Sequence, residues 1–181
     1  AAFIEKNKDQ PFFLYLATHD IHVPRVPHPR FKGTSQAGVR GDAVHSFDWT
    51  VGNVLDALER LKLADNTLVI VTSDNGGVLD ANGPDKEHGG TVETNNGHLH
   101  NGTLRGGKGG AFEGGTRIPF IARWPRHIPP GTSDALICHV DMLASFAALT
   151  GQKLPDAAGP DSFNVLPALL GAKDGRDHLV E

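Results

Sequence analysis

Cysteine is nearly absent from this sequence, and its scarcity excludes several kinds of site. Cys138 is the single cysteine among 181 residues, so the chain can form neither an internal disulfide nor a cysteine-rich zinc site. We interpret Cys138 as a buried residue of a short strand at Leu136-Ile137-Cys138. The histidines His88, His98 and His100 match no strong zinc spacing, so we expect them either to face solvent or to lie at the rim of a substrate pocket.

Positive charge is not in excess, and no apolar run is long. The chain has 17 Lys and Arg against 21 Asp and Glu, a formal net charge of −4 with the two signs interleaved. Without a basic face it cannot hold a nucleic-acid backbone through counterion release, which excludes nucleic acid as a partner. No run approaches the roughly 20 apolar residues that span a bilayer, and the first residues lack a signal peptide's apolar stretch.

Two short apolar runs predict buried strands of an α/β fold. The runs at 11–16 and 68–71 are bounded by polar residues, which is typical of central strands covered on both faces. Between them, apolar residues recur at spacings of three and four and predict an amphipathic helix: Val44, Phe47, Val51, Val54, Leu55, Leu58 and Leu61. A strand, helix, strand order favours a right-handed crossover with parallel strands, whose carboxyl ends lie at one edge.

A long stretch at about 76–116, rich in Gly, Asn and His, has almost no periodicity. Compact domains rarely keep such a loop unless it is functional or disordered. Beyond it we predict a strand at 118–124 and a helix near 165–170. Asp141 is predicted to cap another helix, which ends at Gly151 and buries four residues: Leu143, Phe146, Ala147 and Leu149. Because strands are predicted close to both termini, we expect residues 1–181 to be part of a larger domain, incomplete at both ends.

Polar residues follow both apolar runs, at the edge where open α/β sheets bind ligands. Asp74 and Asn75 offer hard oxygen ligands suited to calcium or magnesium, although an Asx turn explains the same residues. His19 and His22 are candidates for metal binding, proton transfer or anion contact, with a hydrogen-bonding loop role as the alternative.

The most informative stretch runs from Leu104 to Arg117. Lys108 stands between glycine pairs, so the backbone can approach a ligand closely while one ammonium group points at an anion. The spacing is not that of a P-loop, and the Phe, Glu and Arg residues are unusual for a flexible linker. We predict an ordered anion-binding loop.

Taken in order, these motifs resemble the type I sulfatases of the alkaline phosphatase superfamily. The resemblance covers nearly the whole chain: Phe12-Phe13-Leu14-Tyr15-Leu16 with His22-Val23-Pro24, then Thr72-Ser73-Asp74-Asn75-Gly76, then Leu104-Arg105-Gly106-Gly107-Lys108-Gly109 through Glu113-Gly114-Gly115-Thr116-Arg117-Ile118-Pro119. It implies an alkaline-phosphatase-like α/β fold, with a mixed, mostly parallel sheet flanked by helices, and hydrolysis of a sulfate monoester.

The resemblance also implies roles for particular residues. Asp74 and Asn75 would bind calcium, with magnesium possible, while His22 and Lys108 would be catalytic and contact the sulfate near its bridging oxygen. Arg105 and His100, in the long loop, are predicted to help bind the substrate, a sulfated small molecule or glycan.

One part of the family pattern is missing. Sulfatases use a formylglycine made from Cys or Ser in a Cys/Ser-x-Pro-x-Arg motif, and neither Cys138 nor any serine here begins such a motif. We expect this motif to lie upstream of Ala1, so that the chain by itself is inactive. For the whole protein we expect a periplasmic or secreted location.

Two alternatives stay open at this point. A phosphoester or phosphonate-ester hydrolase of the same superfamily would share the metal scaffold, and Lys108 would serve phosphate as readily as sulfate. A non-catalytic module that binds anionic glycans would use the same His and Lys groups without a nucleophile.

Overall fold

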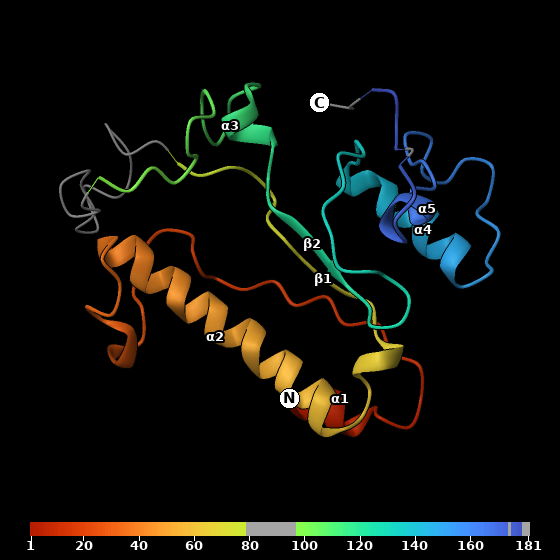
Figure 1. Ribbon diagram of the computed structural model, residues 1–181, viewed down its shortest axis with the longest axis horizontal. Helices are drawn as coiled ribbons and strands as arrows, with labels where there is room; N and C mark the ends of the chain where they lie inside the picture. The colour runs from red at the N-terminus through yellow and green to blue at the C-terminus, as the bar shows by residue number, and fades with distance from the viewer. Residues whose placement is uncertain (79–96, 174, 179–181) are drawn as a thin grey trace. The chain divides into compact units, whose positions relative to one another are not determined.

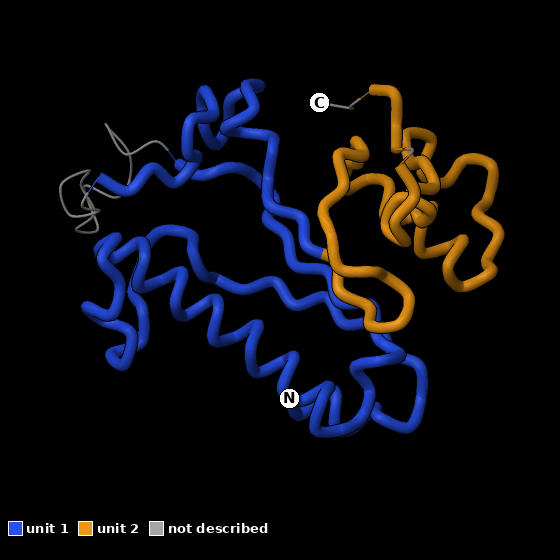
Figure 2. Tube along the Cα trace, in the orientation of Figure 1, with its two compact units in different colours: residues 1–121 blue, residues 122–181 orange. Residues whose placement is uncertain are grey.

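The structure, a computed structural model, describes residues 1–78, 97–173 and 175–178 (Figure 1). The chain divides into two compact units, residues 1–121 and 122–181 (Figure 2). The helices and strands in the described ranges are α1 (Ala2–Lys6), α2 (Gly38–Arg60), β1 (Val69–Thr72), α3 (Glu113–Thr116), β2 (Phe120–Arg123), α4 (Met142–Leu149) and α5 (Leu166–Leu169), with short 3-10 turns at Pro29–Phe31, Ala64–Asn66 and His139–Asp141. Among the described residues, no helix is long and apolar enough to cross a membrane.

Helix α2 confirms the amphipathic helix predicted from its apolar spacing, and it begins six residues before Val44. Its C-terminal half carries the core of the first unit, where Ile4, Ala57, Leu58 and Ala64 are buried. The helix ends in a Schellman motif: the Leu63 amide donates to the Leu58 carbonyl and the Lys62 amide to the Glu59 carbonyl. Lys62 takes the left-handed conformation that this motif requires, at a φ of 58°.

The predicted strands at 68–71 and 118–124 are both present, as β1 and β2. They pair with each other in a two-stranded sheet and run in opposite directions (Figure 1). The Thr72 hydroxyl donates to the Pro119 carbonyl at 2.8 Å and extends this pairing by one polar contact. All four residues of β1 are half-buried, so the prediction of a strand covered on both faces was wrong for the described residues.

The run at 11–16 is extended but belongs to no sheet among the described residues, contrary to the prediction of a central strand parallel to β1. Phe13 and Tyr15 are 71% and 82% exposed, while Phe12 packs against the core of α2. The apolar run still favours an extended backbone. A strand also needs a neighbour with free backbone groups, and the neighbour of β1 here is β2.

The second unit is organised around a buried ion pair. The side chains of Asp141 and Arg176 are fully buried, with 3.1 Å between Oδ1 and Nη1. The Asp141 carboxylate also accepts hydrogen bonds from the Cys138 and Phe163 amides, and the Arg176 guanidinium lies over the Phe163 ring. These contacts tie three separate segments of the second unit together.

Helix α4 differs from its prediction in which residues it buries. Asp141 stands at the N-cap position, but its carboxylate accepts no hydrogen bond from the helix because it is engaged elsewhere. The buried helix residue is Ser145, whose hydroxyl accepts from the Val165 amide, whereas Leu143 is 49% exposed. The end of the helix near Gly151 and the short helix α5 are as predicted.

Cys138 is half-buried and stands in an extended segment rather than in a strand, which corrects both expectations for Leu136 to Cys138. Among the described residues, the Leu136 carbonyl accepts from the Arg176 amide in a single backbone bond rather than a ladder. Cys138 instead begins the 3-10 turn at His139–Asp141, where its amide donates to Asp141 at 2.7 Å. The Asp141 carboxylate thus takes the place of the backbone carbonyl that a neighbouring strand would have offered to the Cys138 amide.

Candidate functional site

The loop that follows β1 carries the two predicted metal ligands. Asp74 is exposed and Asn75 is half-buried. The Ser73 hydroxyl donates to the Asn75 carbonyl at 2.9 Å, and the Asn75 Nδ2 donates to the Gly76 carbonyl at 2.8 Å. Because the Asn75 Nδ2 donates to the Gly76 carbonyl, its Oδ1 is the atom of this amide that can serve as a ligand.

The stretch at 104–117, here called the lysine loop, packs directly against this metal-ligand loop through backbone groups. The Gly76 amide donates to the Gly115 carbonyl at 2.8 Å, and the Lys108 amide donates to the Gly77 carbonyl at 3.0 Å. A Cβ on Gly76 would lie 1.9 Å from the Gly114 oxygen, and one on Gly114 would lie 2.2 Å from the Gly106 oxygen. The glycines are therefore required by close backbone approach rather than by flexibility.

His22 and Lys108, which are 86 residues apart in the sequence, meet at this point. The Lys108 Nζ lies 3.1 Å from the His22 Nε2, and the His22 Nδ1 lies 2.7 Å from the Val23 carbonyl. Since a carbonyl only accepts, Nδ1 carries the proton and Nε2 accepts a hydrogen bond from the ammonium group. Both side chains are exposed, so a substrate can reach them.

His19 lies beside His22 but is engaged differently. The two rings are 6.5 Å apart, edge to face, and the His19 Nε2 donates to the Pro24 carbonyl at 3.2 Å. The His22 amide also donates to the His19 carbonyl. These bonds match the hydrogen-bonding loop role that was left open for His19, which closes the turn that presents His22.

The other residues of the long loop lie at varied places. His100 packs against the metal-ligand loop, because a Cβ on Gly77 would lie 2.4 Å from its ring. The Arg105 guanidinium lies over the Phe112 ring, 3.7 Å from the centroid, and is exposed. His98 is exposed, and His88 lies outside the described residues.

The donor set fits a hard cation in kind but forms only part of a complete site. Calcium binds six to eight oxygen ligands, and Asp74 with Asn75 supplies a carboxylate and an amide oxygen. Within residues 1–78, 97–173 and 175–178, no group of three or more His, Cys, Asp or Glu side chains is placed to hold a metal. Further ligands must therefore come from elsewhere in any complete site.

Sequence reasoning overlooked Asn101, whose side chain hydrogen-bonds both the metal-ligand loop and the lysine loop. An Asn-Gly pair is ordinarily interpreted as a turn, so Asn101-Gly102 gave no separate signal. Its position three residues before the Leu104-Arg105-Gly106 motif was the available hint.

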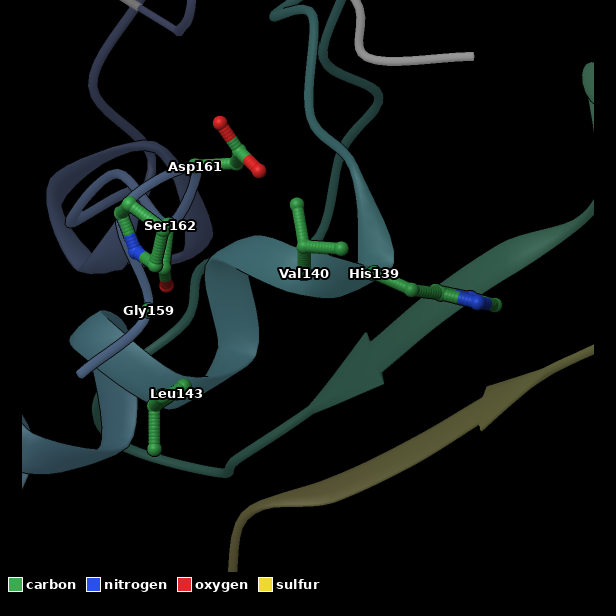
Figure 3. A pocket seen from close by; sticks show the side chains of 7 residues that line it. His139, Val140, Leu143, Gly159, Asp161 and Ser162 are labelled. Atoms are coloured by element: carbon green, nitrogen blue, oxygen red, sulfur yellow. The ribbon is translucent and has the colours of Figure 1, made fainter. Parts of the chain in front are cut away.

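A cavity of about 360 Å³ lies in the second unit and contains none of the predicted site residues (Figure 3). It is lined by His139, Val140, Leu143, Gly159, Pro160, Asp161 and Ser162. In Figure 3 the His139 ring lies apart from the Asp161 carboxylate, so these two polar groups do not converge on a common point. We therefore assign the chemistry to the loops around Lys108.

The sulfatase family profile matches residues 1–152. The chain belongs to the sulfatase family. It is 50% identical over 182 residues to an N-acetylgalactosamine-6-O-sulfatase of Bacteroides thetaiotaomicron, covering 99% of this chain and 35% of the relative. It is 38% identical over 180 residues to human steryl-sulfatase, covering 98% of this chain and 29% of that protein.

A solved structure from work on glycosaminoglycan metabolism by Bacteroides thetaiotaomicron is also similar, with a TM-score of 0.87 and 48% identity. The match covers 97% of this chain and 36% of that one. This likeness confirms the predicted alkaline-phosphatase-like α/β fold. The chain thus spans about a third of the length of the sulfatases it matches.

Proposed function

We propose that the whole protein is a sulfatase that hydrolyses a sulfate monoester, and that this chain supplies part of its active site. The observation that supports it best is the 3.1 Å contact between Lys108 and His22, held beside Asp74 and Asn75 by backbone bonds between the two loops. An ammonium group, an imidazole and two oxygen ligands held close together suit the transfer of an anionic group.

The chemistry of each residue follows from its contacts. The Lys108 ammonium offsets negative charge on the sulfuryl oxygens as a point charge. The Val23 carbonyl holds a proton on the His22 Nδ1, so a second proton on Nε2 is the one that can be given to the bridging oxygen of the departing alcohol. A substrate oxygen entering between the two groups would replace their direct contact.

The cofactors proposed are calcium, with magnesium as the alternative cation, and a formylglycine. A bound divalent cation lowers the cost of charge on the sulfuryl group. Asp74 and Asn75 would hold it together with ligands from outside this chain. The formylglycine would come from the other two thirds of the protein, since no Cys/Ser-x-Pro-x-Arg motif occurs in these 181 residues.

The substrate class proposed is a sulfated carbohydrate. The supporting observation is the 50% identity to an N-acetylgalactosamine-6-O-sulfatase, against 38% to human steryl-sulfatase. Arg105 and His100 are proposed as binding residues at the rim, since Arg105 is exposed and its guanidinium edge remains open to an anion while its face lies over Phe112.

The test uses the full-length protein, matured to formylglycine, and measures release of inorganic sulfate from 6-sulfated N-acetylgalactosamine. Lys108→Ala and His22→Ala should each lower kcat by about 100- to 1,000-fold. Lys32→Ala, at an exposed lysine on another loop, is the matched control and should stay within twofold of the parent protein. Chelation should abolish turnover, and added calcium should restore it more fully than magnesium.

Three results would decide against the proposal. Faster hydrolysis of the matched phosphate ester would favour the phosphoester alternative, and glycan binding without turnover would favour the non-catalytic module. Sulfate release by residues 1–181 alone would contradict the claim that the nucleophile lies outside this chain.

A further inference from the structure

The side chain of Asn101 connects the metal-ligand loop to the lysine loop. Its Oδ1 accepts a hydrogen bond from the Gly77 amide at 2.8 Å. Its Nδ2 donates to the Gly77 carbonyl at 3.1 Å and to the Gly106 carbonyl at 3.0 Å. One side chain therefore pairs with both backbone groups of Gly77 and also holds a residue 29 positions further along the chain.

Each bonded residue lies two positions from a residue of the proposed site. Gly77 follows Asn75 by two residues, and Gly106 precedes Lys108 by two. The Gly77 carbonyl also accepts from the Lys108 amide, so it receives two donors from the two sides of the junction. The distance between the Asp74-Asn75 pair and the Lys108 ammonium thus depends on a set of bonds centred on Asn101.

We infer that Asn101 is a positioning residue, which sets the spacing between the metal ligands and Lys108. The inference rests on the proposed function, since it assigns a role in that site. Asn101 acts through backbone groups and does not itself touch the reacting atoms. Its contacts join segments 24 and 5 residues away, whereas a turn-forming Asn bonds its own neighbours.

The chemistry of the junction requires an amide at this position. A carboxylate of the same shape keeps the bond from the Gly77 amide but faces two carbonyl oxygens without a donor, so both of those contacts become repulsive. Glutamine keeps the donors and the acceptor but carries one more methylene. Because the ring of His100 packs against Gly77 on the same side, the longer side chain has little room to adjust.

The experiment compares Asn101→Asp, Asn101→Gln and the control Asn53→Asp in the full-length, matured protein. Asn53 lies on α2, where its amide donates to the Trp49 carbonyl, away from both loops. Asn101→Asp should lower kcat by at least 30-fold and raise the calcium concentration for half-maximal activity at least fivefold, with KM changed less than threefold. Asn101→Gln should lose less than Asn101→Asp, and Asn53→Asp should stay within twofold.

Measuring rates at a lower temperature distinguishes a variant that has lost stability from one in which the site residues are misplaced. Rates are measured at least 20 °C below each variant's unfolding midpoint, so that every variant is folded. A kcat within threefold of the parent protein for Asn101→Asp overturns the inference. So does a loss of rate that disappears at the lower temperature, because a purely structural role predicts that recovery.

Hydrogen exchange provides a readout that does not depend on turnover. In peptides that cover the Gly77 and Lys108 amides, exchange should be at least tenfold faster in Asn101→Asp and unchanged in Asn53→Asp. Equal exchange in all variants overturns the inference even where sulfate is released. If the parent protein releases no sulfate, the proposed function fails, and the positioning role is then judged by exchange and calcium binding alone. Faster exchange in Asn101→Asp without a change in its calcium binding overturns the positioning role as well.

Discussion

Replacing Gly76 with alanine tests how closely the two loops must pack. The added Cβ would lie 1.9 Å from the Gly114 oxygen and 3.1 Å from the Gly115 Cα. Both neighbours are backbone atoms, so no side-chain rotation can relieve the clash. Because ordinary contact begins near 3.4 Å, the loops would have to separate by about 1.5 Å.

A separation of this size breaks specific bonds. The Gly76 amide to Gly115 carbonyl bond, now 2.8 Å, would lengthen beyond hydrogen-bonding distance. One lost bond and local overpacking together should lower the free energy of unfolding by about 2 to 4 kcal/mol. Since a misplacement of about 1 Å costs about 100-fold in rate, kcat for sulfate release should fall by at least that factor.

The assay is sulfate release by the full-length, matured Gly76→Ala protein, with chemical denaturation measured on the same sample. Gly52→Ala is the matched control, because a Cβ at Gly52 meets no atom within 4 Å. Inside α2 it should raise the free energy of unfolding by about 1 kcal/mol and leave the rate unchanged. A Gly76→Ala protein with parental rate and stability would refute the packing of these loops.

Three further predictions concern stability and titration. Asp141→Ala should lower the free energy of unfolding by about 3 to 5 kcal/mol in denaturation, because Arg176 is left buried without its partner, whereas Asp177→Ala, at an exposed site, should leave the unfolding midpoint unchanged. His178→Ala should raise the pKa of Asp177 in an NMR titration, since the hydrogen bond from His178, and then its charge, hold that pKa below its usual range. Lys62→Gly should raise the free energy of unfolding by about 0.5 to 1 kcal/mol, because glycine adopts the left-handed φ of 58° without strain. An unchanged midpoint in the first or last case, or an unchanged pKa in the second, would contradict the contact named.

Local patterns predicted the elements whose stability depends on their own residues. The spacing of apolar residues identified α2 because the apolar residues of an amphipathic helix recur every three or four positions. The runs at 68–71 and 118–124 were predicted as strands from their composition, and they form strands because each pairs with the other. The run at 11–16 has the same composition, but the described residues give it no sheet to join. Composition predicts an extended backbone, and pairing requires a partner.

The chemical types of the candidate site residues could also be predicted from the sequence. Asp74 and Asn75 follow a strand, and Lys108 stands among glycines, so their chemistry could be argued before their positions were known. Their convergence was expected from the strand ends and from the resemblance to sulfatases, and the structure brings Lys108 to His22 beside the loop that carries Asp74 and Asn75. Their roles in catalysis stay a proposal, which the variants at Lys108 and His22 test.

By itself, the sequence determined the family, the main helix, two strands and the chemical identity of the site residues, because each is encoded in a local motif or period. The tertiary structure decided which backbones touch and which side chains join them. It brings Lys108 within 3.1 Å of His22 and places the Asn101 amide between two loops, and it buries Asp141 against Arg176. Such contacts depend on distances between residues that are far apart in the chain, so local sequence propensities cannot predict them.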